Sequence, residues 1–177
     1  ERNSMGMKTI SQALNIRSLI LENFEQAVLK QDDCDRNCLM NFCLVGGGPT
    51  GVELAGALAE MKKGILHKDY PDLDISQMQI NLIQSGDRIL NTMTEKASAN
   101  ATKFLTDLDV NVLTNVRVES YDGKNLLTNT NLSFETATVI WTAGVQGALV
   151  PGLDAESLIL RAMRIKVDQN NKVERYN

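Results

Sequence analysis

The stretch Phe42-Cys-Leu-Val-Gly-Gly-Gly-Pro-Thr-Gly-Val-Glu-Leu-Ala-Gly-Ala-Leu-Ala-Glu60 decides the fold of this chain. An apolar run from Phe42 to Val45 leads into a glycine-rich turn, which continues into an alanine-rich segment with helical periodicity. Gly46, Gly48 and Gly51 provide the spacing G-x-G-x-x-G. The spacing alone is a weak signal, but between an apolar strand and an amphipathic helix it indicates a dinucleotide-binding β-α-β unit. The alternative is a plain strand–turn–helix joint.

Each glycine of this spacing has its own mechanical role. Gly46 makes the tight exit from the strand, Gly48 lets the backbone approach a pyrophosphate, and Gly51 lets the helix pack closely on the strand. The first turn of the helix presents free N–H groups and a partial positive charge to the phosphates. We therefore predict a diphosphate-binding loop made of Gly46, Gly47, Gly48, Pro49, Thr50 and Gly51.

Composition limits the function classes. The chain has 177 residues, 43% of them hydrophobic and 23% charged, which are ordinary values for one globular domain. Its net charge of −4 argues against general affinity for nucleic acid. No stretch approaches the roughly 20 apolar residues that cross a bilayer. Three cysteines and one histidine lack the spacing of a zinc site, so no metal site is predicted. Cys43, within the apolar strand, is expected to be a buried thiol.

Periodicity predicts the other elements. Residues 1–8 are expected to be a linker or a boundary segment, and a polar connection is expected around residues 32–36. The glycine-turn helix is expected to bury Leu54, Leu58, Met61 and Ile65. Further helices are expected over Ile10–Leu29 and from Thr92 or Thr94 to Leu108, and further strands over Ile80–Ile83 and Val110–Leu113. Thr92 with Glu95 fits a capping box at the start of the second of these helices, and Thr94 is a competing cap.

The pattern changes after residue 115. Three short strands, joined by Asp122-Gly123 and by residues 129–131, indicate an antiparallel meander. They cover Val116–Tyr121, Lys124–Leu127 and Leu132–Phe134, and a buried strand over Ala137–Thr142 follows them. The predicted fold class is α/β: a Rossmann-like domain with a small parallel sheet, flanking helices and an antiparallel β-meander. A last strand is expected over Arg164–Val167.

With these motifs in place, the chain resembles the NADH-binding domain of flavoproteins that have two dinucleotide domains. Within that group it is most similar to type II NADH dehydrogenases, the NADH:quinone oxidoreductases. Four segments carry the resemblance, which covers residues 6 to 174: Leu14–Ala27, Val45–Gly56, His67–Leu73 and Val139–Val145. The segment His67-Lys-Asp-Tyr-Pro-Asp-Leu73 is the most family-specific. The resemblance implies that residues 9–147 form the NADH-binding domain and that residues 148–177 return toward an FAD domain that this chain lacks.

The resemblance also implies the activity of the longer enzyme, an oxidoreductase that passes a hydride from NADH to FAD and electrons on to quinone. The chain alone is expected to be inactive. The expected partners are NADH, the FAD domain of the same chain and quinone, and a homodimer is left open. The expected location is cytoplasmic, with the full-length enzyme peripheral on the inner face of the cell membrane and the membrane touched only by regions absent here. The alternatives are the NAD(P)H domain of another flavin-dependent reductase (disulfide, nitrite or ferredoxin type) and a non-catalytic dinucleotide-binding module.

Glu53 is expected in the first turn of the phosphate-facing helix. In similar enzymes this acid helps to orient the nicotinamide ring against the flavin, so Glu53 is the predicted catalytic positioning residue. The alternative is a solvated acid that stabilises the helix dipole. Thr142, Ala143 and Gly144 end the closing strand at the sheet edge where open α/β sheets bind ligands, and we expect them near the nicotinamide half.

Gln84 ends the second strand of the β-α-β unit, where an acidic residue usually binds the adenosine ribose. With Ser85 and Arg88 it completes the predicted cofactor site. Glutamine has no charge to repel a 2′-phosphate, and Arg88 could attract one. We therefore expect NADH to be preferred only modestly over NADPH; the alternative is that Gln84 only binds the ribose diol.

Overall fold

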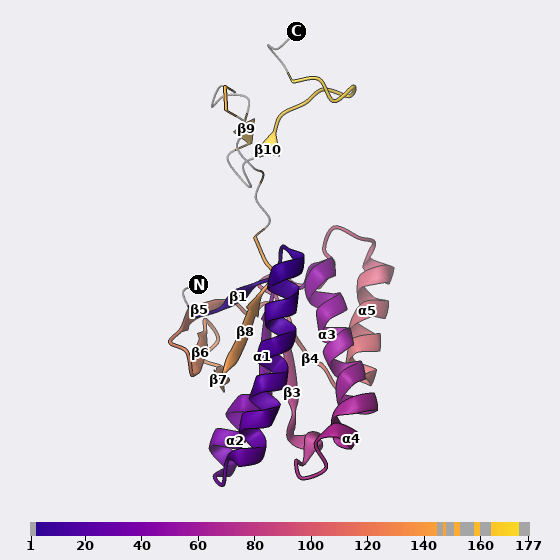
Figure 1. Ribbon diagram of the computed structural model, residues 1–177. Coiled ribbons are helices and arrows are strands. Elements are labelled where there is room, and N and C mark those ends of the chain that lie inside the picture. Colours follow the sequence, from indigo (N-terminus) through magenta and orange to yellow (C-terminus); the bar gives the residue numbers. More distant parts are fainter. Residues whose placement is uncertain (1–2, 145–146, 148–150, 153–157, 160–163, 174–177) are drawn as a thin grey trace. The chain divides into compact units, whose positions relative to one another are not determined.

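The computed structural model describes residues 3–144, 147, 151–152, 158–159 and 164–173 (Figure 1). The chain divides into two units, residues 1–143 and 144–177, with the boundary slightly before the one expected at residue 147. The first unit contains a parallel sheet, its helices and the meander.

A parallel sheet of five strands organises the first unit. In spatial order its strands are β1 (Met5–Gly6), β8 (Thr138–Trp141), β2 (Asn41–Val45), β3 (Gln79–Ile83) and β4 (Asn111–Leu113). Every pair within this sheet is parallel. The carboxyl ends of β2, β3 and β8 therefore meet at one edge, as the predicted α/β class requires.

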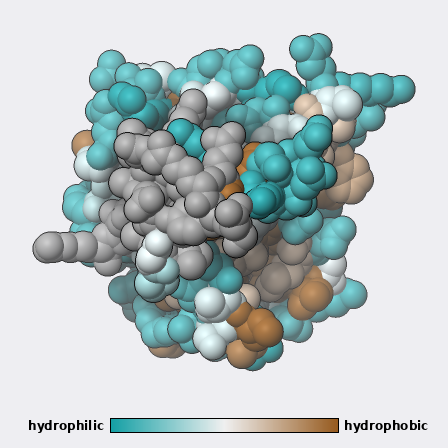
Figure 2. All heavy atoms as spheres, turned by 90° about the horizontal axis from the view of Figure 1, so that it is seen from above, coloured by the Kyte–Doolittle hydropathy of each residue, from teal (hydrophilic) through white to brown (hydrophobic). Residues whose placement is uncertain are grey.

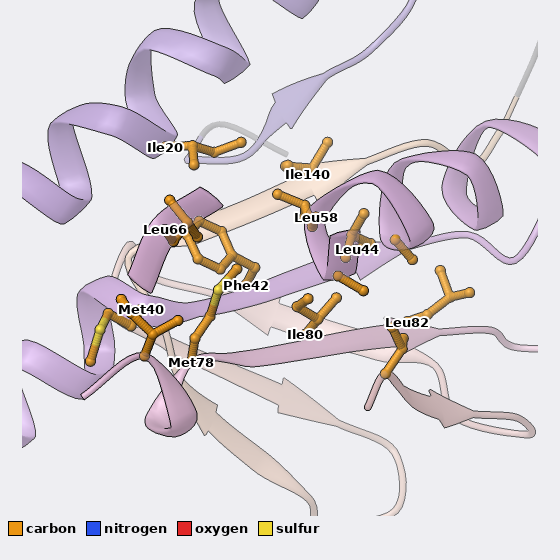
Figure 3. Packing of buried hydrophobic residues seen from close by; sticks show 14 of the residues in the cluster. Ile20, Met40, Phe42, Leu44, Leu58, Leu66, Met78, Ile80, Leu82 and Ile140 are labelled. Carbon is orange, nitrogen blue, oxygen red and sulfur yellow. The ribbon is translucent and has the colours of Figure 1, made fainter. Parts of the chain in front are cut away.

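Helices pack on one face of this sheet, and alternation along the strands explains why. Phe42, Leu44 and Ile80 point to the helical face and are fully buried with Leu58 and Leu66 (Figure 3). The intervening residues face the opposite side. The main helices are α1 (Ile10–Leu29), α2 (Asp33–Met40), α3 (Pro49–Met61) and α5 (Glu95–Asp107), with a π-helical turn at Lys62–Leu66, the short helix α4 (His67–Asp69) and a 3-10 turn at Ile75–Gln77. The bounds of α1 are those predicted.

The meander covers the other face, as predicted. Its strands are β5 (Val118–Tyr121), β6 (Asn125–Thr128) and β7 (Ser133–Glu135), and both of its strand pairs are antiparallel. Cys43 lies in the cluster between sheet and meander and is fully buried, which confirms the prediction of a buried thiol. Burial raises the pKa of this thiol to about 12.

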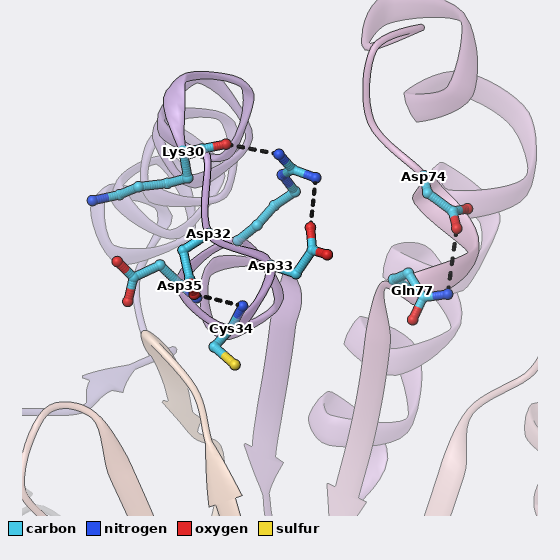
Figure 4. A network of polar contacts seen from close by, with 8 residues as sticks. Lys30, Asp32, Asp33, Cys34, Asp35, Asp74 and Gln77 are labelled. Carbon is cyan, nitrogen blue, oxygen red and sulfur yellow. Dashed lines mark hydrogen bonds and ion pairs between the residues drawn. The ribbon is translucent and has the colours of Figure 1, made fainter.

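Two predictions for the N-terminal part were wrong. Residues 1–8 are not merely a linker, because Met5 and Gly6 pair with β8 as the edge strand β1. A two-residue strand is too short to show a periodic pattern. The polar connection around residues 32–36 is in fact the start of α2, capped by Asp32, whose carboxylate accepts hydrogen bonds from the N–H groups of Cys34 and Asp35 (Figure 4).

Thr94, the competing cap, is the one that α5 uses. Its hydroxyl accepts a hydrogen bond from the Ala97 N–H at 3.2 Å, and the helix begins at Glu95. The expected capping box of Thr92 with Glu95 was wrong, because Glu95 is the first residue of the helix rather than the third.

The buried stripe of α3 shifts by one residue where the helix widens. Leu58 is 1% exposed, but Ile65 is 51% exposed, so its predicted burial was wrong. Leu66 is buried in its place, at 1% exposed. The π-helical turn at Lys62–Leu66 explains the shift, because each π turn contains about one residue more than an α turn.

This shift predicts different costs for two neighbouring truncations. Leu66→Ala should lower the free energy of unfolding by about 3 kcal/mol, because it leaves a cavity in the core. Ile65→Ala should change it by less than about 0.5 kcal/mol, because that side chain is half exposed. Urea unfolding of both variants measures the difference. Equal losses would show that the stripe continues through Ile65.

The second unit contains a small antiparallel pair, β9 (Leu158–Ile159) with β10 (Arg164–Ile165). The strand expected over Arg164–Val167 is present in its first half, and Val167 forms an isolated bridge with Val173. The return segment expected at 148–177 falls partly outside the described residues. Its direction toward a flavin domain stays a prediction.

Across the described residues, no helix combines the length and the apolar character needed to cross a bilayer. The part of the surface drawn in colour in Figure 2 is largely hydrophilic, with hydrophobic residues in small separate groups.

Candidate functional site

A cavity of about 290 Å³ lies where β2, β3 and β8 end and the meander begins. Open α/β sheets bind their ligands at this edge. The residues that line the cavity are Val45, Gly46, Ile83, Gln84, Ser85, Val116, Arg117, Val118, Trp141 and Ala143. Four of the predicted site residues are therefore brought together: Gly46, Gln84, Ser85 and Ala143.

Gly46 and Gly51 have the geometry that their predicted roles require. Gly46 has a φ of +119°, which side chains rarely tolerate, and a Cβ there would lie 2.7 Å from the Ala143 nitrogen. A Cβ on Gly51 would lie 1.9 Å from the Gly46 carbonyl oxygen. No side chain fits in either position. The close packing of the start of α3 against the end of β2 therefore requires glycine at both.

Gly48 differs from both, because no heavy atom of the described residues, its two chain neighbours aside, lies within 4 Å of the place that its Cβ would occupy. It is the N-cap residue of α3 and makes no side-chain cap hydrogen bond, and Pro49 follows in the first turn. The first N–H groups of a helix have no acceptor within the helix. The open space beside Gly48 is therefore next to the N–H groups at the start of α3 that lack such an acceptor. This is the arrangement that an anionic diphosphate would complete.

Gln84 is half-buried and supports the glycine loop. Its side-chain oxygen Oε1 accepts a hydrogen bond from the Gly47 N–H at 2.8 Å. Thr142 supports the same loop from β8, since its hydroxyl lies 3.1 Å from the Val45 carbonyl oxygen and 3.0 Å from that of Gly46. Two predicted ligand residues therefore also hold the loop in shape.

We expect the hydrogen bond between Gln84 and Gly47 to require an oxygen on the side chain of residue 84, whether or not that side chain is charged. Gln84→Ala should lower the free energy of unfolding by about 1 kcal/mol, because the Gly47 N–H loses its acceptor. Gln84→Glu keeps an oxygen in the same place and should stay within about 0.5 kcal/mol of the parent chain. Chemical unfolding of the three proteins tests this. A loss in the glutamate variant as large as that in the alanine variant would contradict it.

Arg88 and Glu53 are among the nine predicted residues that do not line the cavity. Arg88 donates from its guanidinium to the carbonyl oxygens of Met93 at 3.0 Å and Asn91 at 2.9 Å, so it is held within its own loop. Glu53 is exposed on α3 and lies just beyond the first turn, which contains no acid, so its predicted position in that turn was wrong. Its role toward the nicotinamide stays a prediction.

The remaining predicted residue, Gly144, belongs to the second unit and has a φ of +76°. Within the described residues, the His, Cys, Asp and Glu side chains form no group of three or more that could hold a metal ion.

Sequence reasoning missed the side of the cavity formed after β4. Val116, Arg117 and Val118 line it. The signal was available, because a parallel β4 must also end at the ligand-binding edge. Trp141 also lines the cavity while contacting the core between sheet and meander.

Comparison with known proteins identifies related sequences and structures. The family model for pyridine nucleotide-disulphide oxidoreductases matches residues 5–177. The type II NADH:quinone oxidoreductase NdhA of Mycobacterium tuberculosis is 32% identical over 96% of this chain and 38% of its own length. A mitochondrial external alternative NAD(P)H-ubiquinone oxidoreductase B1 of Arabidopsis thaliana is 34% identical over 78% of this chain and 25% of its own length.

A solved structure gives the same fold. NDH2 from Plasmodium falciparum in complex with NADH matches with a TM-score of 0.77 and 24% identity, over 93% of this chain and 34% of that one. The chain thus spans less than two fifths of the length of these relatives, 38% and 25% of the two curated sequences.

Proposed function

Because the chain belongs to the pyridine nucleotide-disulphide oxidoreductase family, we propose that it is the NADH-binding domain of a type II NADH:quinone oxidoreductase. The observation that supports this most is the open space before Gly48 at the uncapped start of α3. Gly46 and Gly51 serve the packing of the loop, whereas the open position at Gly48 leaves room for an anionic ligand to approach the backbone.

In this proposal each part of the site meets one part of NADH. The N–H groups at the start of α3 bind the diphosphate, and Gly46 and Gly51 keep that helix end against the sheet. Gln84 and Ser85, beside the cavity, bind the adenosine ribose. The Gln84 Oε1 is already engaged with Gly47, so its amide nitrogen is the group that faces the ribose hydroxyls.

The nicotinamide half belongs at the end of β8. Ala143 allows close approach there, while Thr142 holds the strand end to the glycine loop. We propose that Glu53, exposed on α3, orients the ring. NADH, when bound, supplies a hydride for FAD in the rest of the enzyme, and the chain's own residues bind and orient the donor.

The partners follow from the same proposal. An FAD domain of the same longer chain receives the hydride, quinone accepts the electrons, and NADPH is a second substrate. We further propose that the longer enzyme sits peripherally on the cytoplasmic face of the membrane and can form a homodimer. The quinone acceptor and the use of NADPH are supported by the names of these relatives, which this chain matches over 38% and 25% of their length. The FAD domain, the membrane location and the homodimer are supported only by the resemblance to the family.

Titration of the 177-residue chain with NADH tests the proposal directly. Trp141 is the only tryptophan and lines the cavity, so its emission should be quenched as NADH fills the site. Adenosine monophosphate should displace NADH and restore the emission. Calorimetry provides an independent measurement. If neither method detects saturable binding, the domain does not bind this nucleotide.

A second experiment separates the proposal from its alternatives. In the longer protein that carries this domain, NADH should bleach the flavin absorbance, and added quinone should restore it. Restoration by a disulfide or a ferredoxin, but not by quinone, would indicate another flavin-dependent reductase. Binding of NADH without any bleaching would indicate a non-catalytic module.

A further inference from the structure

The charge of the cavity at the end of β2 and β3 suggests a more specific ligand. None of the described residues that line this cavity is acidic, and Arg117 is the one charged residue among them. Dinucleotide sites that exclude a 2′-phosphate usually do so with an acid at the end of the second strand, where this chain has Gln84. The cavity is therefore suited to a ligand that carries extra negative charge.

Arg117 is held in place by its backbone while its side chain stays available. Its N–H donates to the Asn129 Oδ1 at 2.7 Å, and its carbonyl oxygen accepts from the Asn129 N–H at 3.0 Å. Its guanidinium makes no hydrogen bond or ion pair with the described residues, and the residue is exposed. A fixed backbone with an unengaged guanidinium is the arrangement of a residue that can bind an anionic group from solvent.

The loop that contains Arg117 is joined to the loop expected to hold the adenosine ribose. The Val116 N–H donates to the Gln84 carbonyl oxygen at 3.0 Å, and the Asn115 N–H donates to that of Gly86 at 2.8 Å. Val116, the residue before Arg117, thus contacts the end of β3 directly. Arg88, the other arginine near this edge, is occupied with the carbonyl oxygens of Met93 and Asn91.

We propose that this cavity accepts an adenosine with a 2′-phosphate, and that Arg117 is the residue that recognises this phosphate. The proposal rests on the proposed function, because the adenosine must first be placed by the glycine loop. A guanidinium pairs with a phosphate through two parallel N–H···O bonds, which neither the ribose hydroxyl of NADH nor a lysine reproduces. Arg117 then decides the relative affinities for NADPH and NADH.

The test compares NADH with NADPH, and adenosine 5′-monophosphate with adenosine 2′,5′-bisphosphate, on the 177-residue chain. Arg117→Gln should weaken both 2′-phosphorylated ligands by about tenfold or more, because a charge-assisted pair is lost. Affinity for the two ligands without a 2′-phosphate should stay within about twofold, because they lack the group that Arg117 is proposed to bind. Arg117→Lys should lose part of the preference. Lys103→Gln removes an exposed cation from α5 and controls for general electrostatic attraction.

The outcomes distinguish this inference from the proposed function. If the parent chain binds NADH, and NADPH affinity is the same in the parent and Arg117→Gln, the inference fails while the proposed function stands. Equal weakening of NADH and NADPH in Arg117→Gln would mean that Arg117 contacts the diphosphate instead, which also overturns it. If the parent chain binds none of the four ligands, the proposed function itself fails.

Discussion

Gly51→Ala is expected to lower the free energy of unfolding by more than about 4 kcal/mol, an unusually large effect for one added methyl group. The new Cβ would lie 1.9 Å from the Gly46 carbonyl oxygen, which is part of the backbone and cannot rotate away. To relieve the overlap, the start of α3 must move away from the end of β2. This movement disrupts the packing of both elements against their neighbours. Because a domain has only about 5–15 kcal/mol of stability, much of the chain should be unfolded.

The same substitution at Gly56 provides the matched control on the same helix. A Cβ there would lie 4.0 Å from the Leu105 Cδ2, which is ordinary contact. Alanine is also the better helix former, so Gly56→Ala should stabilise the chain by about 0.5–1 kcal/mol. Urea unfolding followed by circular dichroism compares the two. If Gly51→Ala costs no more than about 1 kcal/mol, the close approach of helix and strand is not required.

The features that sequence could predict are those decided within a few residues. The roles of Gly46 and Gly51 follow from local geometry, and the structure confirms both steric requirements. The full extent of α1 was predicted because 20 residues of helical periodicity leave little ambiguity. α2 was missed, although Asp32 is a typical cap, because the polar residues after it have no apolar stripe.

The features that sequence could not predict depend on distant partners. The contact between Gln84 and Gly47 forms only because β2 and β3 are neighbours with a particular register. Arg117 reaches the cavity because β4 pairs with β3 and because the turn at Asn129 lies beside it. No spacing along the chain records these pairings. The presence of Arg117 at the cavity could therefore be recognised only once the order of the strands was known.

Gly48→Val is expected to weaken NADH binding by at least about a hundredfold while the domain stays folded. Apart from the chain neighbours of Gly48, no atom of the described residues lies within 4 Å of the new Cβ, so the branched side chain would fill the space in which the diphosphate must approach the backbone. The residue has φ −76° and ψ −180°, which a valine adopts without strain. The cost to the fold is limited to a poorer helix cap, about 1 kcal/mol.

This pairing of normal stability with lost binding is the opposite of the result expected at Gly51. Quenching of Trp141 by NADH measures the affinity, and thermal unfolding measures the fold. Gly48→Ala, with one methyl group, should give an intermediate loss, whereas Gly64→Ala, in the π-helical turn and also in open space, should bind NADH like the parent chain. A folded Gly48→Val that binds NADH normally would mean that the diphosphate does not lie at the start of α3, because a ligand there would have to occupy the volume of the valine side chain.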